Sequence, residues 1–362
     1  MANKSILNQR AIAALKNLFV ADSLAMPLHW FYRTSDIFKA FPDGITLFSD
    51  APAHHPSSIM SLHSTSQGGR KKTITGTKPK EIIGDVILKG KREFWDIPNI
   101  HYHHLMKAGD NTLNAHCARV VMRSLHENGG YYDSGIFLRR YIEFMTSETP
   151  KHNDTYAESY HRGFFDNLEK GKPSNQCGAK THDTASIGGL VTIAPIVISE
   201  RLLETPLDEV QLKCKEHLML THPDQKLATI CEHYVRLIDK LLYRTDSEPL
   251  QDIINKTSIK SIGLNLDKLK HAVKEDQQVV GDLYSSACYI QDSWPSTLYL
   301  AYRYHNDIKK ALISNTNLGG DNVHRGCVLG VILGLINGKT REGFFEFLLA
   351  KDEVSSEILN LM

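Results

Sequence analysis

Residues 315–338, NTNLGGDNVHRGCVLGVILGLING, run from a polar turn directly into an apolar helical pattern. Asp321 stands at the position of a helix N-cap, directly after Gly319 and Gly320. Three more glycines recur at every fourth position and share one helix face: Gly326, Gly330 and Gly334. Because glycine costs a helix interior about 1 kcal/mol relative to alanine, this face predicts a neighbour that packs very closely. The stretch indicates either a capped helix that crosses another tightly, or a polar site at the positive end of a buried helix.

The composition excludes several classes of protein. The chain has 362 residues, enough to bury one large core or two ordinary ones. Its 42 basic and 41 acidic side chains nearly cancel, which gives no electrostatic case for nucleic acid or an anionic membrane as a partner. The apolar runs look too short for a bilayer span, so we expect neither a transmembrane segment nor a signal peptide. The six cysteines lie far apart without a CxxC pair, which predicts reduced core cysteines in a cytoplasmic protein.

Helical periodicity dominates the chain, and period-two alternation is scarce. Residues 44–104 differ, because they are rich in Pro, Gly, Ser and His, and they predict a long loop or a small hairpin. No repeat or linker divides the chain. We therefore expect one all-α domain over residues 1–362, with a loop-rich insertion at about 44–104. The expected helices cover about 6–26, 113–126, 135–146, 155–169, 186–204, 208–219, 224–243, 266–276, 280–290, 295–304, 307–314 and 322–337.

Polar residues interrupt the helical pattern in five places, and three of these are acidic turns that precede an apolar helix. The three turns are Asp110-Asn111-Thr112, Asp183-Thr184 and Asp321-Asn322. Aspartate and threonine at such positions are common N-caps, each worth about 1 kcal/mol. An all-helical protein also keeps its polar chemistry at such breaks. The residues alone leave both interpretations open.

Three segments match one protein family in their order and context. Residues 21–29, ADSLAMPLH, resemble the family's GDALGAPVE motif, and residues 109–112, GDNT, resemble its DDT turn. Residues 317–326, NLGGDNVHRG, resemble its NLGGDTDT motif. Over most of its length the chain resembles the ADP-ribosylglycohydrolases. The resemblance implies a compact orthogonal multi-helix bundle that hydrolyses the N- or O-glycosidic bond between ADP-ribose and an acceptor. It also implies two Mg²⁺ ions, held by the two aspartate turns.

The sequence departs from the family pattern at the implied metal ligands. His29 stands where the family has its first glutamate, and Asn111 replaces the second aspartate of the DDT turn. In the C-terminal turn, Val323 replaces the second aspartate and His324 replaces the threonine. Mg²⁺ prefers six hard oxygen ligands, so the remaining carboxylates compensate two ions poorly. We expect at most one Mg²⁺ ion, or none, on the ligands that remain: Asp110, Thr112 and Asp321.

The replacements put histidines beside the acidic turns, which suits acid–base chemistry. We predict a catalytic group of four residues: His29, Asp110, Asp321 and His324. Histidine acts as a general acid or base near neutral pH, so one of the two would activate water. Eight residues are predicted to bind the substrate: Trp30, Asn111, Asp154, Glu158, His161, Asp183, Asn322 and Arg325. Arg325 lies at a helix N-terminus and suits the pyrophosphate of ADP-ribose, whereas Trp30 would stack on adenine or pack in the core.

Segment 152–162, HNDTYAESYHR, carries several of these residues on one face of a helix. The face is spaced at i, i+4, i+7 and i+8, and consists of Asp154, Glu158, His161 and Arg162. It is either solvated surface or, since aromatic residues interleave with it, partly buried. Two other features are weaker. The histidines at 101, 103 and 104 lack the HExxH pattern or cysteine partner of a zinc site, and a basic loop at 65–72 lacks a Walker pattern, so at most it lies beside the substrate.

Two function classes remain open from the sequence. The first is a hydrolase of ADP-ribose or of a related N-glycoside, with an altered, His-rich site. The alternative is a non-catalytic member of the same fold, which binds an ADP-ribose-like ligand or serves structurally as some lens crystallins do. Hydrolysis of a different N-glycoside would use the same residues as hydrolysis of ADP-ribose, so the sequence does not separate these two activities. The sequence also does not determine the oligomeric state.

Overall fold

The computed structural model describes residues 4–58, 60, 80–245, 247–340 and 343–362. Within these ranges the chain forms helices and no β-strand, which confirms the predicted all-α class. The helices are α1 Lys4–Ala25, α2 Thr34–Ala40, α3 Leu113–Glu127, α4 Ser134–Met145, α5 Ser159–Glu169, α6 Ile193–Leu202, α7 Leu207–Thr221, α8 Gln225–Leu242, α9 Leu250–Ile262, α10 Leu266–Ala272, α11 Ile290–Arg303, α12 Ile308–Asn317, α13 Asn322–Asn337 and α14 Lys351–Leu359.

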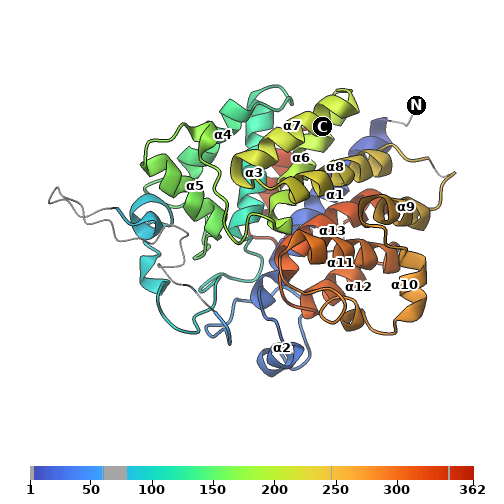
Figure 1. Ribbon diagram of the computed structural model, residues 1–362, viewed down its shortest axis with the longest axis horizontal. Helices are drawn as coiled ribbons and strands as arrows, with labels where there is room; N and C mark the ends of the chain where they lie inside the picture. Colours follow the sequence, from blue (N-terminus) through green and yellow to red (C-terminus); the bar gives the residue numbers. More distant parts are fainter. Residues whose placement is uncertain (1–3, 59, 61–79, 246, 341–342) are drawn as a thin grey trace.

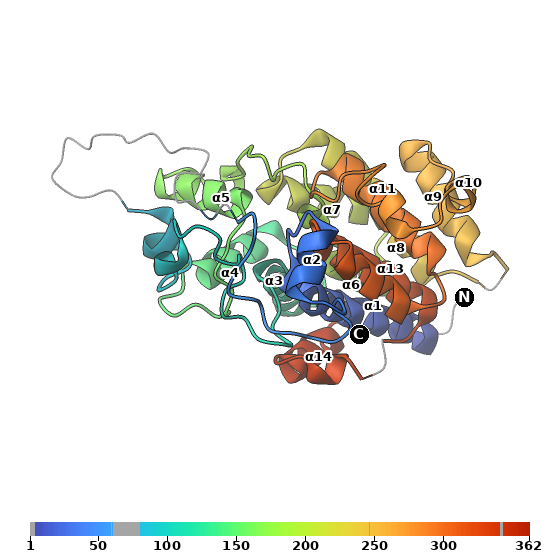
Figure 2. The ribbon, with the colours of Figure 1, turned by 90° about the horizontal axis from the view of Figure 1, so that it is seen from below.

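Helices α1 and α13 lie side by side in the middle of the molecule (Figure 1). Helices α3, α4 and α5 lie to one side of this pair and α9, α10 and α11 to the other, an arrangement that is also seen from below in Figure 2. The predicted close neighbour of the glycine face is α1. A Cβ atom on Gly330 would lie 2.4 Å from the Asn17 carbonyl oxygen, and one on Gly334 would lie 2.5 Å from the Ala13 carbonyl oxygen. The glycine spacing therefore confirms a tight helix crossing.

The first helix is longer and more apolar than the sequence analysis expected. Residues Lys4–Leu28, which comprise α1 and the short 3₁₀ helix Met26–Leu28, reach a mean hydropathy of 1.4 and are long enough to cross a membrane. However, 89% of that apolar window is buried inside the fold. Its apolar length is accounted for by contacts with the core, above all with α13.

Two glycines bring the chain after α1 to the start of α13. The φ angles of Gly319 and Gly320 are +63° and +62°, a left-handed conformation that favours glycine. A Cβ atom on Gly319 would lie 2.1 Å from the Phe31 carbonyl oxygen. The backbones also pair, because Trp30 N donates to Gly320 O and Gly320 N donates to Phe31 O, each at 2.7 Å. These contacts hold residues 29–31 against the N-terminus of α13.

The helix assignment from periodicity was wrong for residues 280–290. In the structure these residues form turns, and α11 begins at Ile290. Their backbone is bound by other segments: Ser286 O accepts a hydrogen bond from Asp321 N at 2.8 Å, and Cys288 O accepts one from Ile187 N at 2.9 Å. The backbone carbonyls of Ser286 and Cys288 thus accept hydrogen bonds from distant segments instead of from a helix of their own. The periodicity also missed three helices: α2, α9 and α14.

The described part of the loop-rich segment 44–104 is irregular, and no hairpin occurs in it. It contains a non-helical turn at Ile82–Val86, in which Gly84 has a positive φ angle, and a 3₁₀ turn, Arg92–Phe94. An isolated bridge between His54 and Ile100 joins its two ends. The basic loop at 65–72 lies outside the described residues.

Candidate functional site

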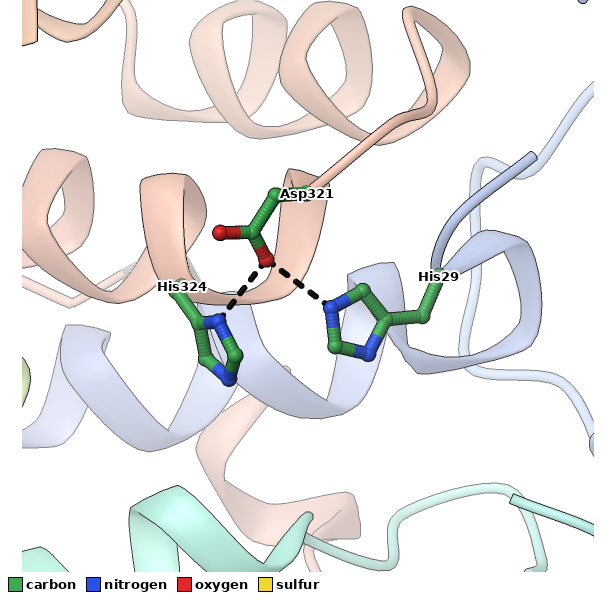
Figure 3. A group of neighbouring side chains, drawn as sticks. All are labelled: His29, Asp321 and His324. Atoms are coloured by element: carbon green, nitrogen blue, oxygen red, sulfur yellow. Dashed lines mark hydrogen bonds and ion pairs between the residues drawn. The ribbon is translucent and has the colours of Figure 1, made fainter. Parts of the chain in front are cut away.

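Three buried polar side chains meet at the N-terminus of α13 (Figure 3). Asp321 Oδ1 lies 2.9 Å from His29 Nε2 and 2.8 Å from His324 Nδ1. The His29 contact is an aligned hydrogen bond, whereas the His324 contact is an ion pair by distance. Asp321 occupies the N-cap position of α13, but its side chain makes no capping hydrogen bond. The structure therefore brings together three of the four residues predicted to be catalytic, with exposed fractions of 0–2%.

A hydrogen-bonded chain continues from His29 away from Asp321. His29 Nδ1 lies 2.7 Å from His103 Nε2, and His103 Nδ1 lies 2.8 Å from Asp154 Oδ1. The chain Asp154–His103–His29–Asp321 thus has three contacts, and each contact needs one proton. Two neutral imidazoles supply only two protons, because a carboxylate only accepts. The chain therefore holds one additional proton.

Burial and nearby charge set the protonation of the two groups at the Asp321 end of this hydrogen-bonded chain. Burial, offset only in part by Asp321, holds the pKa of His29 well below its usual range. Burial would raise the pKa of Asp321, but the contacts with His324 and His29 lower it below the usual range of a carboxyl. His29 is therefore neutral, and it donates through one ring nitrogen and accepts through the other.

His324 is a cationic position of the site. Its Nε2 atom lies 3.2 Å from Glu158 Oε1, so the imidazole stands between two carboxylates. Burial disfavours the charged form, but Asp321 and Glu158 together raise the pKa of His324 well above its usual range. Asn114 Nδ2 lies 2.7 Å from the same Nε2 atom, so an imidazolium at this position requires the Asn114 amide to turn its oxygen toward His324. Among the described residues, the Glu158 Oε2 atom has no hydrogen-bond partner.

A second layer of polar residues orients Asn114. With the amide turned in this way, its nitrogen takes the place of Oδ1, where it faces the Tyr160 hydroxyl oxygen and lies 3.1 Å from His161 Nε2, and it donates to both. His161 Nδ1 in turn lies 2.5 Å from the Tyr141 hydroxyl oxygen. Burial holds the pKa of His161 well below its usual range. The segment 152–162 is thus buried, and His161 supports the cluster through Asn114.

Two of the predicted acidic residues cap helices other than those that follow them. Asp154 Oδ2 accepts from Leu113 N, the first residue of α3, at 2.8 Å. Asp183 Oδ2 accepts from both the backbone and the hydroxyl of Ser159, the first residue of α5. Carboxylates at helix N-termini satisfy donors that the helix leaves free. Asp154 therefore positions α3, which carries Asn114, and Asp183 positions the start of α5, next to Glu158.

Asp22 holds the turn before α3, and the sequence analysis missed it. Asn111 Nδ2 and Thr112 N donate to Asp22 Oδ1, and the Thr112 hydroxyl donates to Asp22 Oδ2 at 2.6 Å. Burial raises the pKa of Asp22 despite these hydrogen bonds. An acidic residue within the apolar pattern of residues 6–26 was the available signal, because a buried carboxylate requires partners.

The remaining predicted residues pack inside the fold. The Trp30 ring stacks on the His29 ring with centroids 3.6 Å apart, and Trp30 is only 8% exposed. Asn322 Nδ2 donates to Thr316 O. Arg325 is fully buried and makes four hydrogen bonds, to Ser286 O, Gly319 O and both oxygens of Asn315. Its guanidinium therefore binds the loop before α13, and the structure leaves no donor edge of it free for a phosphate.

The comparisons with known proteins agree with this fold. A family model for the ADP-ribosylglycohydrolases matches residues 3–341, and the chain belongs to this family. A solved structure described as an ADP-ribosylglycohydrolase-related protein complex is similar over 99% of this chain and 98% of that chain, with a TM-score of 0.59. At 15% sequence identity, this likeness shows the fold alone. No curated protein matches the chain. The predicted bundle of the ADP-ribosylglycohydrolase type is confirmed.

Members of this family usually use divalent metal ions, and the cluster at α13 can be tested for its fit to Mg²⁺. The possible ligand atoms of His29, Asp321 and His324 all lie within 4.8 Å of one another. However, they comprise two imidazole nitrogens and one carboxylate, whereas Mg²⁺ takes oxygen ligands. The other two predicted ligands are not in this group. Asp110 accepts from Lys107 N and the Asn153 amide, and Thr112 donates to Asp22. The residues present do not fit Mg²⁺.

Proposed function

We propose that this protein hydrolyses the glycosidic bond between ADP-ribose and an acceptor, with the cluster of His29, Asp321 and His324 as its catalytic centre. One observation carries the proposal. In a chain of a glycohydrolase family, polar side chains from both ends of the sequence converge on the N-terminus of a buried central helix. A structural role alone would not require two histidines around a single buried carboxylate oxygen. Desolvation makes buried charge of this kind costly, and ionisable groups with strongly shifted pKa values cluster at functional sites.

The geometry supports a division of roles within the cluster. His324, held as an imidazolium by two carboxylates, is the group that donates a proton to the leaving acceptor. Glu158 Oε2, which no described residue hydrogen-bonds, is the acceptor available to a water molecule. His29 and His103 form a positioning chain, because they hold Asp321 at one end and are fixed by Asp154 at the other.

Substrate access requires movement of Trp30. The cluster is closed, and the Trp30 ring covers His29. Trp30 has a φ angle of +62°, which costs a non-glycine residue about 1–2 kcal/mol. Rotation of the Trp30 side chain about χ1 would uncover His29 and leave the Trp30 N–Gly320 O hydrogen bond in place. We therefore propose that Trp30 is the side chain that leaves when the ligand enters, and not a preformed platform for adenine.

The test is an assay of ADP-ribosyl-arginine and ADP-ribosyl-serine, with and without Mg²⁺. His324→Asn and Glu158→Gln should each lower turnover by roughly 10²- to 10⁴-fold, the usual contribution of general acid–base catalysis. Their affinity for ADP-ribose should stay within about tenfold of wild type. His217→Asn is the matched control, because His217 is equally buried but contacts Tyr132 and Thr192.

Binding of ADP-ribose without hydrolysis of any conjugate would instead support the non-catalytic alternative. We also place the protein in the cytoplasm, since all six cysteines are free thiols and five of them are buried. The proposed partner is a small-molecule or protein-linked ADP-ribose conjugate, and the acceptor remains to be identified by the same assay.

A further inference from the structure

We propose that Arg162 is the binding residue for the phosphate groups of the ligand, a diphosphate such as that of ADP-ribose. The identity of the ligand rests on the proposed function, whereas the assignment of Arg162 rests on its own contacts. The sequence analysis assigned the pyrophosphate to Arg325, which the structure instead shows bound to backbone and amide oxygens. Arg162 lies on α5, one turn after Glu158.

Arg162 is buried without a hydrogen-bonding partner. It is 1% exposed, and none of its three nitrogens, Nε, Nη1 and Nη2, has a hydrogen-bond acceptor in the part of the chain that the structure describes. A guanidinium carries five N–H donors and keeps its charge at any physiological pH. Burial of such a group without acceptors is costly, and native proteins rarely leave it so. No described residue supplies an acceptor to Arg162, so we look for the acceptor in a ligand.

The other buried arginines show that this fold can satisfy a guanidinium. Arg119 forms a two-pronged ion pair with Glu357, at 2.8 and 3.0 Å. Arg10 donates to the backbone carbonyl oxygens of Leu242 and Arg244. Together with Arg325, three of the four buried arginines among the described residues thus have oxygen partners. Arg162 is the exception.

Two aromatic rings contact the Arg162 guanidinium, and its N–H groups have no acceptor among the described residues. Its guanidinium carbon lies 5.2 Å from the Trp95 ring centroid and 5.7 Å from that of Tyr156, both within the range of cation–π contacts. Ring faces attract the cation but accept none of its in-plane N–H bonds. Glu158, the N-cap residue of α5, lies four residues before Arg162, a spacing that favours an ion pair. Its carboxylate contacts His324 and His161 instead. The nearest carboxylate along the helix, that of Glu158, therefore forms no ion pair with Arg162.

The free edge of a guanidinium matches a phosphate. Its parallel N–H groups bind two oxygens of a phosphate or carboxylate at once, with charge-assisted hydrogen bonds. The position favours a phosphate of the proposed substrate. The Tyr156 ring, which contacts Arg162, also packs edge-on against Trp30 with centroids 5.1 Å apart, and Trp30 covers His29. Tyr156 and Trp30 therefore connect Arg162 to His29 through successive ring contacts. A ligand whose diphosphate is attached to the reacting ribose needs a phosphate-binding residue near the catalytic cluster.

The experiment measures binding of inorganic pyrophosphate, ADP-ribose and adenosine to the full-length protein, by calorimetry and by thermal shift. Wild type should bind pyrophosphate and ADP-ribose and should bind adenosine more weakly. Because Trp95 and Trp30 are the covering side chains, binding should also change the tryptophan fluorescence. Arg162→Met should bind both phosphate-bearing probes roughly 10- to 100-fold more weakly, the loss expected for charge-assisted hydrogen bonds.

The unliganded variants supply a readout that a structural arginine would not give. Arg162→Met should melt at or above the wild-type temperature, since it removes an uncompensated buried charge. The matched control, Arg119→Met, should melt lower because it orphans Glu357, and should bind pyrophosphate as wild type does. Arg162→Lys should bind with intermediate affinity, since it keeps the charge but not the two-pronged geometry.

The inference is overturned if Arg162→Met binds the probes as tightly as wild type, or if wild type binds neither probe. A lower melting temperature for Arg162→Met with unchanged binding would likewise assign it a structural role. These outcomes are separate from the proposed function. If wild type binds pyrophosphate through Arg162 but hydrolyses no conjugate, the hydrolase proposal fails and the binding site stands. If His324→Asn loses turnover but keeps pyrophosphate affinity, both are supported.

Discussion

Asp321 and His29 are 292 positions apart in the sequence, yet Asp321 Oδ1 lies 2.9 Å from His29 Nε2 and neither side chain is exposed. The backbone pairing of Trp30 with Gly320 makes this contact possible, because it brings the end of the first helical segment onto the N-terminus of α13. The cluster therefore depends on the α1–α13 crossing as much as on its own side chains. The predictions that follow test the cluster and the crossing separately.

Asp321→Asn should destabilise the protein by about 3–5 kcal/mol, the usual cost of leaving one partner of a buried ion pair uncompensated. The reason is that His324 and His29 lose the anion between them. Asp133→Asn is the control, because Asp133 caps α4 through Ile136 N at the surface and asparagine caps about as well. Urea unfolding at neutral pH gives both values. Equal stability of the two variants would mean that the Asp321 charge does not hold the two histidines.

Magnesium should bind weakly or not at all, because the cluster offers one carboxylate and two imidazoles. Millimolar Mg²⁺ should leave the melting temperature unchanged, and calorimetry should detect no site of micromolar affinity. EDTA treatment of the purified protein should not change its stability toward urea. Titration of two ions with micromolar affinity would refute this expectation and would require further carboxylates at the site.

Gly330→Ala should cost about 1–3 kcal/mol of stability, as overpacking of a core usually does. The added Cβ atom would lie 2.4 Å from the Asn17 carbonyl oxygen of α1, which is backbone and cannot turn aside. Gly135→Ala in α4 is the matched control. Its Cβ atom would meet only the Asp133 side chain at 3.2 Å, and alanine favours a helix by about 1 kcal/mol. A neutral Gly330→Ala would contradict the tight crossing.

Acid should destabilise the fold through histidines that are buried in the neutral form. Burial lowers the pKa of His217 to about 3. The unfolded chain takes up this proton as the pH falls through its ordinary value near 6.5, whereas the folded chain does not. The stability contribution is therefore complete above pH 6.5 and is lost as the pH falls toward 3. At pH 5 the loss amounts to roughly 2 kcal/mol.

His217→Gln should remove this part of the pH dependence. Chemical unfolding at pH 7 and pH 5 should show wild type losing roughly 2 kcal/mol more than the variant between the two values. His271→Gln is the control, since its side chain is 77% exposed and its substitution should leave the difference as in wild type. An equal loss in wild type and His217→Gln would show that His217 does not contribute.

The sequence by itself determined the elements whose signal is local. The glycines at every fourth position of α13 predicted a closely packed neighbouring helix. Gly319 and Gly320 indicated a turn with positive φ angles, which only glycine adopts without strain. The three motifs in order indicated the family. They also placed His29, Asp321 and His324 in one predicted group, and these three side chains do lie together. Their catalytic role stays a prediction.

Only the tertiary structure decided which partner each polar group has. Arg325 and Arg162 look alike in sequence, yet the loop before α13 satisfies the first, whereas the second meets only aromatic rings. Asp183 precedes one helix and caps another. Residues 280–290 carry a helical pattern but bind the backbone of their neighbours. Periodicity and turn chemistry act over a few residues, whereas hydrogen-bond partners and burial depend on which segments the whole fold brings together, which no local pattern encodes.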